Sequence, residues 1–568
     1  MRTAAEASSP PAPAATVDLA VDLAVAADVD GIPADVLHRR WSILGVLCTS
    51  LLVIVLANTS MNVALPTMSR SLGLSASAQQ WVVDAYALVF AGLLFTAGTL
   101  GDRFGRKGFL QLGLVLFGIG SAYATFVADS GAEVIGARAV MGIGGALVMP
   151  ATLSILVNSF PRHERARAIA IWTGISGAGG AVGLVLGGWL VEHFWWGSTF
   201  AMNLPVVAVS LLVGARILPT SRDEGETHID VVGSILSMAG LGTLVFGLIE
   251  APHWGWTSAS TIGAVLGGLA LLVLFALWEL HTDLPMLDVR LFRSRSFGVS
   301  SLGVTLVFLV MFGFFFVVVQ MFQLLFGYGP FESGLRMLPF VPVMIVVTTL
   351  TPTLTKRFAV RDVVTLGMVL TAAGVLELSF LDGSSSYGQV LVGMFVMAAG
   401  MGLTMTPMTD LIMSSVPVTH AGVGSAMNDT TRELGTTLGV AILGSVLSSV
   451  YADHLPGAVD QLPADAAEAV RGSLGGAVAV GQQIGGEAGA QLITVAQDAW
   501  THGMQAALQV GAGIVGVAAI ITFAFLGRHT AGSHRRHHAG DHAGTHAGVG
   551  TGVTDGVAGP LAAEPVSA

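Results

Sequence analysis

The sequence predicts an all-α integral membrane protein: two six-helix bundles related by pseudo-twofold symmetry plus two inserted central helices, with about 14 transmembrane helices in total. Three observations predict this fold. The composition is strongly apolar, apolar runs of membrane-spanning length follow one another along the chain, and residue patterns of the first half return in the second half.

The composition excludes a soluble globular protein. Hydrophobic residues make up 53% of the 568 residues and charged residues only 11%, and the mean hydropathy is +0.75. A soluble domain carries roughly 25% charged residues. The single cysteine, Cys48, has no partner for a disulfide within the chain.

Apolar runs set the number of predicted membrane crossings. A spanning helix needs about 20 mostly apolar residues, and a helix satisfies its own backbone hydrogen bonds in lipid. About fourteen such runs lie near residues 42–65, 81–100, 109–128, 132–157, 166–190, 198–218, 231–250, 260–279, 297–321, 334–351, 363–382, 388–412, 431–451 and 503–526.

Charges in the loops predict the orientation. The loops at 101–108, 158–167, 280–295 and 352–362 are rich in arginine and lysine, whereas the alternate loops hold few basic residues. Basic loops remain in the cytoplasm. We therefore expect a plasma-membrane protein with both termini in the cytoplasm and the acidic loop at about 452–500 outside.

Both ends of the chain are predicted to be disordered cytoplasmic tails, residues 1–40 and 528–568. The second tail is rich in histidine and contains His538-Ala-Gly, His542-Ala-Gly and His546-Ala-Gly. Histidine tracts can bind metal ions. We favour a solvated tail over that alternative and expect no metal site.

An internal repeat predicts the two bundles. Three patterns return at offsets of 254, 257 and 256 residues. They are Thr99-Leu100-x-x-Arg103-Phe104 with Thr353-Leu354-x-x-Arg357-Phe358, then Gly136, Gly145 and Pro150 with Gly393, Gly402 and Pro407, and finally Gly179, Gly183 and Gly188 with Gly435, Gly439 and Gly444. The shift covers an even number of spans, so both copies share one orientation. Residues 41–218 and 296–527 are the expected bundles, and 219–295 holds the inserted seventh and eighth spans.

A glycine-rich basic motif joins the second and third spans: Gly98-Thr-Leu-Gly-Asp102-Arg103-Phe-Gly105-Arg106-Lys107. Its glycines permit a tight turn, and Asp102 can lie near a helix N-terminus, where a negative charge is favourable. The motif resembles the G-x-L-x-D-R-x-G-R-[KR] signature of the major facilitator superfamily, which implies a cytoplasmic gate. The alternative is a basic loop that only sets the orientation.

Other motifs resemble the fourteen-span drug:proton antiporters of the EmrB/QacA group. They are Asn62-Val-Ala-Leu-Pro66, Trp81-Val-Val-Asp-Ala-Tyr86, Ala137-Arg138-Ala-Val-Met-Gly142-Ile-Gly144, Gly422-x-Gly424-Ser-Ala-Met-Asn428 and Arg432-Glu-Leu-Gly435. The resemblance implies proton-coupled export of hydrophobic, cationic small molecules by alternating access.

Two departures from that group keep other functions open. Leu56-Ala57-Asn58-Thr59 replaces the usual L-D-x-T acid of the first span, and Gly183-Leu184-Val-Leu-Gly187-Gly188 lacks the proline of the antiporter motif. Gly183, Gly187 and Gly188 still permit close helix packing. An importer or uniporter of the same fold is one alternative, and a non-transporting receptor or scaffold is another. No catalytic motif is present in the sequence, so we do not expect an enzyme.

Acids within the spans are the candidates for proton coupling: Asp84, Glu377 and Asp410, with Arg138 as a partner. An ionisable residue at such depth is costly and is a functional candidate by default. Asp84 is the first choice, because the usual acid of the first span is absent. The alternatives are a solvated rim position for Asp84 and hydrogen bonds from Arg138 to backbone carbonyls.

A methionine stripe on the twelfth span is a candidate cavity wall. Met394, Met397, Met401, Met405 and Met408 share one helix face, and methionine suits promiscuous apolar surfaces. Packing on a neighbouring helix is the alternative. The predicted cavity residues are Asn58, Asn62, Met401, Met405, Phe312 and Gln320. We expect no cofactor other than the proton as coupling ion, a small-molecule substrate, the lipid bilayer as surroundings, no nucleic-acid partner, and a monomer.

Overall fold

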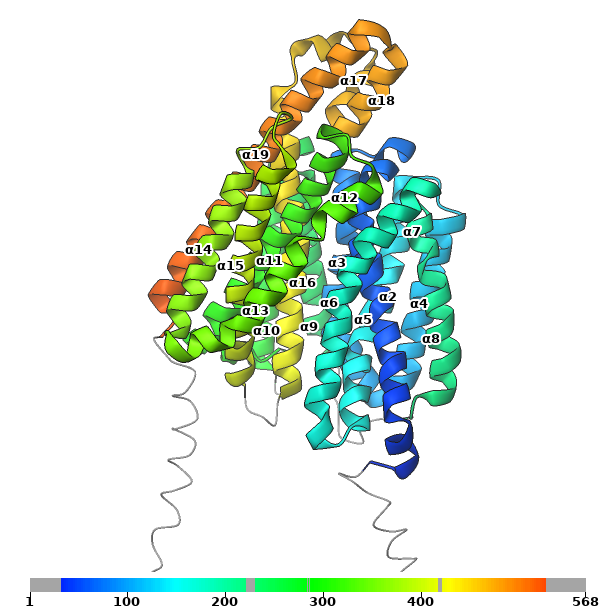
Figure 1. Cartoon of the computed structure of the whole chain (residues 1–568), viewed down its shortest axis with the longest axis vertical. Coiled ribbons are helices and arrows are strands. Elements are labelled where there is room, and N and C mark those ends of the chain that lie inside the picture. The colour runs from blue at the N-terminus through cyan, green and yellow to red at the C-terminus, as the bar shows by residue number, and fades with distance from the viewer. Residues whose placement is uncertain (1–31, 221–229, 283–284, 286, 417–420, 528–568) are drawn as a thin grey trace, which may run out of the picture.

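The computed structural model describes residues 32–220, 230–282, 285, 287–416 and 421–527 (Figure 1). Most of the two predicted tails lies outside these residues. The helices are α2 (Ala34–Leu72), α3 (Ala76–Phe104), α4 (Arg106–Phe126), α5 (Gly131–Ser159), α6 (Arg162–His193), α7 (Ser198–Ala201), α8 (Asn203–Ile217), α9 (Val231–Trp254), α10 (Ala259–His281), η1 (Val289–Arg293), α11 (Arg295–Gln320), η2 (Met321–Leu325), α12 (Pro330–Met337), α13 (Phe340–Arg357), α14 (Val360–Leu378), α15 (Tyr387–Ser414), α16 (Ala421–His454), η4 (Gly457–Gln461), α17 (Ala464–Gly472), α18 (Leu474–Ile484) and α19 (Gly486–Phe525).

Twelve helical segments of the described chain are long and apolar enough to cross a membrane. Helices α3 and α14 are not among the twelve, although both pack within the bundles. The all-α membrane fold is therefore confirmed, and the count of fourteen stays a prediction. The tenth predicted span, 334–351, differs in detail, because the helix is interrupted at Pro339 between α12 and α13.

Two bundles with the same neighbour pattern make up the molecule. In the first, α2 packs on α6 and α8, α3 packs on α5, and α4 packs on α5 and α8. In the second, α11 packs on α16 and α19, α13 packs on α15, and α14 packs on α15 and α19. Each helix of the first bundle thus has a counterpart with equivalent neighbours, which is the arrangement that the internal repeat predicts.

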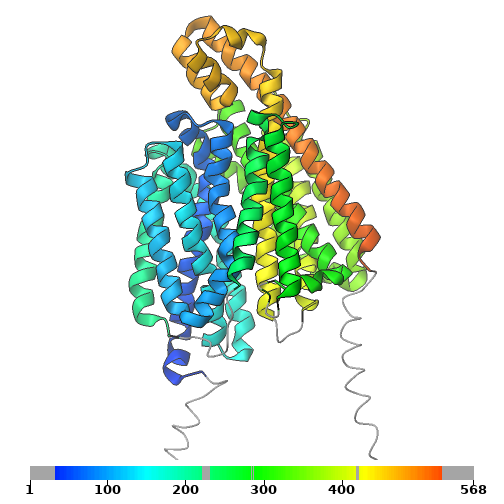
Figure 2. The same ribbon diagram turned by 180° about the vertical axis from the view of Figure 1, so that it is seen from behind.

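The bundles meet along two seams. The first seam joins α3 to α16, and the second seam joins α6 to α12. Helix α9 lies over the first seam and hydrogen-bonds to both bundles (Figure 2). Trp81 on α3 donates to Glu250 at 3.3 Å, and Ser445 on α16 donates to the carbonyl of Leu248 at 2.6 Å. The inserted helices are central in the sequence but lie at the side of the molecule in space.

Two ends of the molecule can be distinguished. Both described chain ends point to one end, here called the tail end, and α17 and α18 cover the opposite end, here called the hairpin end (Figure 1). Helices α17 and α18 belong to the longest predicted loop, which is therefore largely helical. Ser473 at the start of α18 donates to the carbonyl of Leu74 at 3.2 Å, so this hairpin of the second bundle rests on the first.

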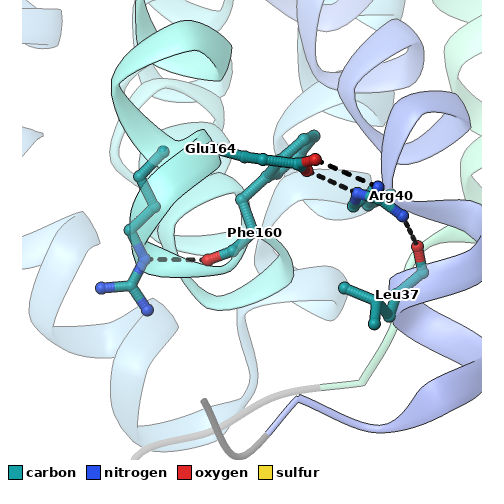
Figure 3. Close-up of polar contacts among 5 residues, drawn as sticks. Leu37, Arg40, Phe160 and Glu164 are labelled. Carbon is teal, nitrogen blue, oxygen red and sulfur yellow. Dashed lines mark hydrogen bonds and ion pairs between the residues drawn. The ribbon is translucent and has the colours of Figure 1, made fainter. Parts of the chain in front are cut away.

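A bidentate ion pair joins α2 to α6 at the tail end (Figure 3). The Arg40 guanidinium donates to both carboxylate oxygens of Glu164, at 2.6 and 3.2 Å, and to the carbonyl of Leu37 at 2.6 Å. Parallel N–H···O bonds of this kind fix geometry as well as charge. The ion pair holds two helices of the first bundle together and does not cross a seam.

Glycines set the distances at which these helices pack. A Cβ on Gly183 would meet Thr59 on α2, and its equivalent Gly439 would meet the carbonyl of Leu309 on α11. Gly188 and Gly444 face the other bundle instead. A Cβ on Gly188 would lie 2.5 Å from the carbonyl oxygen of Pro330 across the second seam. The repeated glycines therefore pack helices within each bundle and also across the seams.

Substitution of Gly188 with alanine tests this role. The added methyl would lie 2.9 Å from Cα of Phe331, a backbone atom that cannot rotate away. We expect G188A to lower the free energy of unfolding by about 1–3 kcal/mol, as overpacked core sites do, measured by thermal unfolding of the purified protein. Gly174 on the same helix has open space around its Cβ position, so G174A is the matched control. Equal melting temperatures for both variants would contradict the close seam.

Candidate functional site

Arg138 is a buried cation that holds α5 against α3. Its Nε donates to the carbonyl of Val82 at 2.9 Å, and its Nη2 donates to the carbonyl of Val83 at 3.4 Å. The guanidinium also lies over the ring of Tyr86, with Cζ 4.4 Å from the ring centroid. Stacking and backbone bonds together spread the charge over several partners. The structure therefore contains the hydrogen bonds from Arg138 to backbone carbonyls that the sequence analysis gives as the alternative role of this residue.

Asp84 lies beside this cation without any hydrogen-bond partner. Its side chain is fully buried, and neither carboxylate oxygen accepts a hydrogen bond. Nη1 of Arg138 is also without a partner, although the two residues are close enough to interact electrostatically. A solvated rim position for Asp84 is therefore wrong. Because an unpaired buried carboxylate is costly, a proton or a cation would stabilise this side chain by neutralising it.

A second group of charged residues lies on α16, the helix that packs on α3 across the first seam. Glu433 interacts electrostatically with Tyr86 across the first seam, and its Oε2 has no hydrogen-bond partner. Asp429 lies one turn earlier, so the two acids share one helix face. Arg432 between them donates to Thr409 at 3.4 Å, while its Nε has no partner. Both helices of the first seam thus carry acids.

Sequence reasoning did not include Asp429 and Glu433 among the coupling acids. The apolar run of the thirteenth span begins near residue 431, whereas α16 begins at Ala421. Asp429 precedes this run and falls outside the predicted span, whereas Glu433 lies inside it. The four-residue spacing of two acids on one long helix, with Arg432 between them, is the signal that could have identified the pair.

Comparison with known proteins identifies the family. The family model described as Major Facilitator Superfamily matches residues 47–440. The chain belongs to this superfamily of transporters. The Multidrug efflux pump LfrA of Mycolicibacterium smegmatis is 34% identical over 86% of this chain and 96% of its own length. The Tetracenomycin C resistance and export protein of Streptomyces glaucescens is 31% identical over 85% of this chain and 91% of its own length.

Solved structures share the fold at low sequence identity. A bacterial homolog of the human lysosomal transporter Spinster, in an inward-facing and unoccupied conformation, superposes with a TM-score of 0.59 at 17% identity, covering 86% of this chain and 98% of that chain. A D-xylose–proton symporter superposes with a TM-score of 0.54 at 16% identity, over 86% of this chain and 98% of that chain. These similarities concern the fold alone.

The transporter places the other two predicted acids elsewhere. Glu377 belongs to α14, and its side chain faces Gly393 on α15. Its Oε2 has no hydrogen-bond partner. Asp410 is exposed near the tail end of α15. Neither residue has a described contact with Asp84 or Arg138. Their assignment to proton coupling stays a prediction.

The predicted cavity residues lie in several places of the transporter. Asn62 donates to the carbonyl of Asn58 on the same helix at 3.3 Å. Gln320 donates to the carbonyl of Phe316 at 3.0 Å and lines a small cavity at the hairpin end. Phe312 is linked to Arg432 of the charged group through the ring of Phe308. Its ring centroid is 6.1 Å from that of Phe308, and Phe308 lies under the Arg432 guanidinium.

The methionine stripe lies mostly inside the second bundle. Met394, Met397, Met401 and Met408 are buried, and only Met405 is partly exposed. The side chain of Met408 packs against Gly303 on α11. This burial favours helix packing as the role of the stripe and leaves Met405 as its accessible member.

The gate motif forms the turn between α3 and α4 at the tail end. Helix α3 ends at Phe104, Gly105 adopts a φ of 117°, and α4 begins at Arg106. Gly98 faces Pro150 on α5. Asp102 lies in the last turn of α3, shortly before α4 begins, and its side chain is outside the described part of the chain, so its place near a helix N-terminus stays a prediction. Arg103 is exposed and lies over Phe104. The role of this motif in gating stays a prediction.

Substitution of Arg138 with lysine tests the contact between α5 and α3. Lysine keeps the charge but lacks the planar fork that reaches two carbonyls. We expect R138K to lower the free energy of unfolding by about 1–3 kcal/mol, measured by thermal unfolding in detergent. R103K on an exposed arginine is the control. If both variants melt at the same temperature as the unmodified protein, the carbonyl bonds do not hold these helices together.

Proposed function

We propose that this transporter exports hydrophobic, cationic small molecules from the cell in exchange for protons. The observation that carries the proposal is the buried, unpartnered carboxyl group of Asp84 beside Arg138, with Glu433 of the other bundle near Tyr86, the ring on which Arg138 stacks. The printed names of the relatives support export, since they describe a multidrug efflux pump and a resistance and export protein.

Charge neutralisation supplies the coupling. A bare carboxylate at a buried seam is costly, and one proton or one cationic substrate removes the charge. Binding both at once would add a further positive charge beside the Arg138 guanidinium. The site therefore holds a proton or a cation in turn, which is the requirement for exchange. Arg138 provides a fixed positive charge that favours release of either ligand once water reaches the seam.

Hydrogen bonds join the two bundles at the hairpin end. Gln323 donates to the carbonyl of Val63 at 2.8 Å, and the backbone N–H of Phe331 donates to Glu192 at 3.0 Å. Both contacts join the two bundles. We assign the hairpin end to the outside and the tail end to the cytoplasm, in agreement with the basic loops. The bundles are then joined on the outer side in this structure, and export requires these contacts to separate as the bundles rock.

Import or uniport by the same fold would use the same bundles but not the same proton dependence. A uniporter moves its substrate at equal rates with and without a proton gradient. An antiporter takes up substrate when the proton gradient is directed outward, whereas a symporter takes it up when the gradient is directed inward. Transport assays with opposed gradients therefore separate the three modes.

Neutralisation of Asp84 is the direct test of coupling. We expect D84N to lower export of a cation such as ethidium under a proton gradient by at least about tenfold, because asparagine cannot release a proton. E433Q should lower the same rate if the second acid shares the role. Rates are measured in proteoliposomes with imposed pH gradients. D84E should keep part of the activity, since its charge still titrates.

The control is E468Q, which removes an exposed carboxylate on α17, outside the bundles. Substrate counterflow without a proton gradient reports whether each variant still binds and moves the cation. Gradient-driven export by D84N at the unmodified rate would remove Asp84 from the mechanism and leave Glu433, Glu377 and Asp410 as candidates.

A further inference from the structure

The two seams between the bundles differ in what covers them. By the internal repeat they are equivalent, since Gly188 on α6 and Gly444 on α16 each pack against the opposite bundle. On the first seam, α9 inserts Leu241, Val245 and Ile249 among apolar side chains of both bundles. No described helix takes the equivalent place on the second seam.

The uncovered second seam contains an apolar groove of about 500 Å³. Its walls come from both bundles and consist only of apolar residues: Ala181, Val182, Val185, Leu186 and Trp189 on α6, Phe331 on α12, and Leu338. Val182 and Trp189 are 49% and 39% exposed within a helix that is long and apolar enough to span the membrane. The volume is in the range of roughly 300–1,000 Å³ that is typical of small-ligand sites.

We propose that this groove binds one acyl chain of a phospholipid with an ammonium headgroup. Hydrocarbon chains are the solvent for membrane-spanning helices, and the groove gives one chain two walls. The occupied first seam supports this, because there the same position takes up the apolar side chains of α9. A flexible chain fills a concave groove more completely than the convex face of a second protein molecule does.

The rim of the groove at the hairpin end selects the headgroup. Trp189 lies at this end, and its ring stacks on His193 with centroids 4.8 Å apart. Tryptophan at such a position is typical of the level of lipid headgroups. Exposed Glu192 lies directly above Phe331, from whose backbone N–H it accepts a hydrogen bond. A negative charge at the rim favours a lipid ammonium over an anionic headgroup.

The bound chain would favour the state seen here. The two walls belong to different bundles, so the groove changes shape whenever the bundles rock. A ligand that contacts both walls in one state stabilises that state by its difference in affinity. This inference concerns lipid binding alone and does not depend on the substrate or on proton coupling.

Photo-crosslinking of lipid tests the proposal. The full-length protein is placed in nanodiscs with a phosphatidylethanolamine that carries a diazirine on its acyl chain, and adducts are mapped by mass spectrometry. We expect adducts to concentrate on the segments 181–189 and 331–338. A181W and L338W fill the groove from opposite walls and should each lower these adducts by roughly fivefold or more. L212W on exposed α8 is the matched control and should have no effect.

Several outcomes would overturn the proposal. Adducts spread evenly over all lipid-facing helices, or unchanged in A181W and L338W, would mean that no groove site exists. No adducts at 181–189, together with a dimer in native mass spectrometry, would identify another copy as the occupant. Equal labelling by the phosphatidylglycerol analogue, or no effect of E192Q on headgroup preference, would refute the headgroup assignment. Thermal unfolding of each variant shows that a loss of adducts does not reflect misfolding.

Discussion

Close contact between helix backbones is the constraint on which this structure depends. Hydrocarbon chains of the lipid surround the helices, so apolar side chains alone provide no driving force for helix association. Small residues allow backbones to approach and to gain dispersion contacts. Gly183 and Gly439 perform this function within the bundles, and Gly188 and Gly444 perform it across the seams. The same residue type therefore builds each bundle and sets how the two bundles meet.

The charged residues Arg138 and Asp84 are buried among the closely packed helices. Arg138 is buried and bonded to two carbonyls of α3, while Asp84 next to it accepts no hydrogen bond. Glu433 approaches from α16 across the first seam. A charge that is buried in one arrangement of the bundles and hydrated in another couples its ligand to the rocking motion. The structure keeps the acid unpaired, so a bound proton or cation changes the free energy of the closed seam.

The insertion of α9 and α10 makes the two seams unequal. Helix α9 fills the first seam and hydrogen-bonds to both bundles through Ser445 and Trp81. The second seam has the repeated glycine contact but an open apolar groove beside it. In this pseudo-symmetric molecule the first seam is covered by α9, whereas the second seam is open to the surroundings of the helices. The hairpin of α17 and α18 adds a further contact from the second bundle to the first.

The sequence by itself determined the fold class and the parallel repeat, and it singled out Asp84 and Arg138, which the structure places together in the buried interior, as candidates for the site. Apolar runs, glycine spacing and the cost of ionisable groups in lipid are local properties that can be read along the chain. Only the tertiary structure decided the partners. Glu433 and Tyr86 are distant in sequence, and they interact electrostatically because α16 packs on α3. The methionine stripe shows the same limit, since helical periodicity places five methionines on one face but does not say whether that face meets a cavity or a neighbouring helix. Burial of four of the five was decided by the packing of α15 inside its bundle.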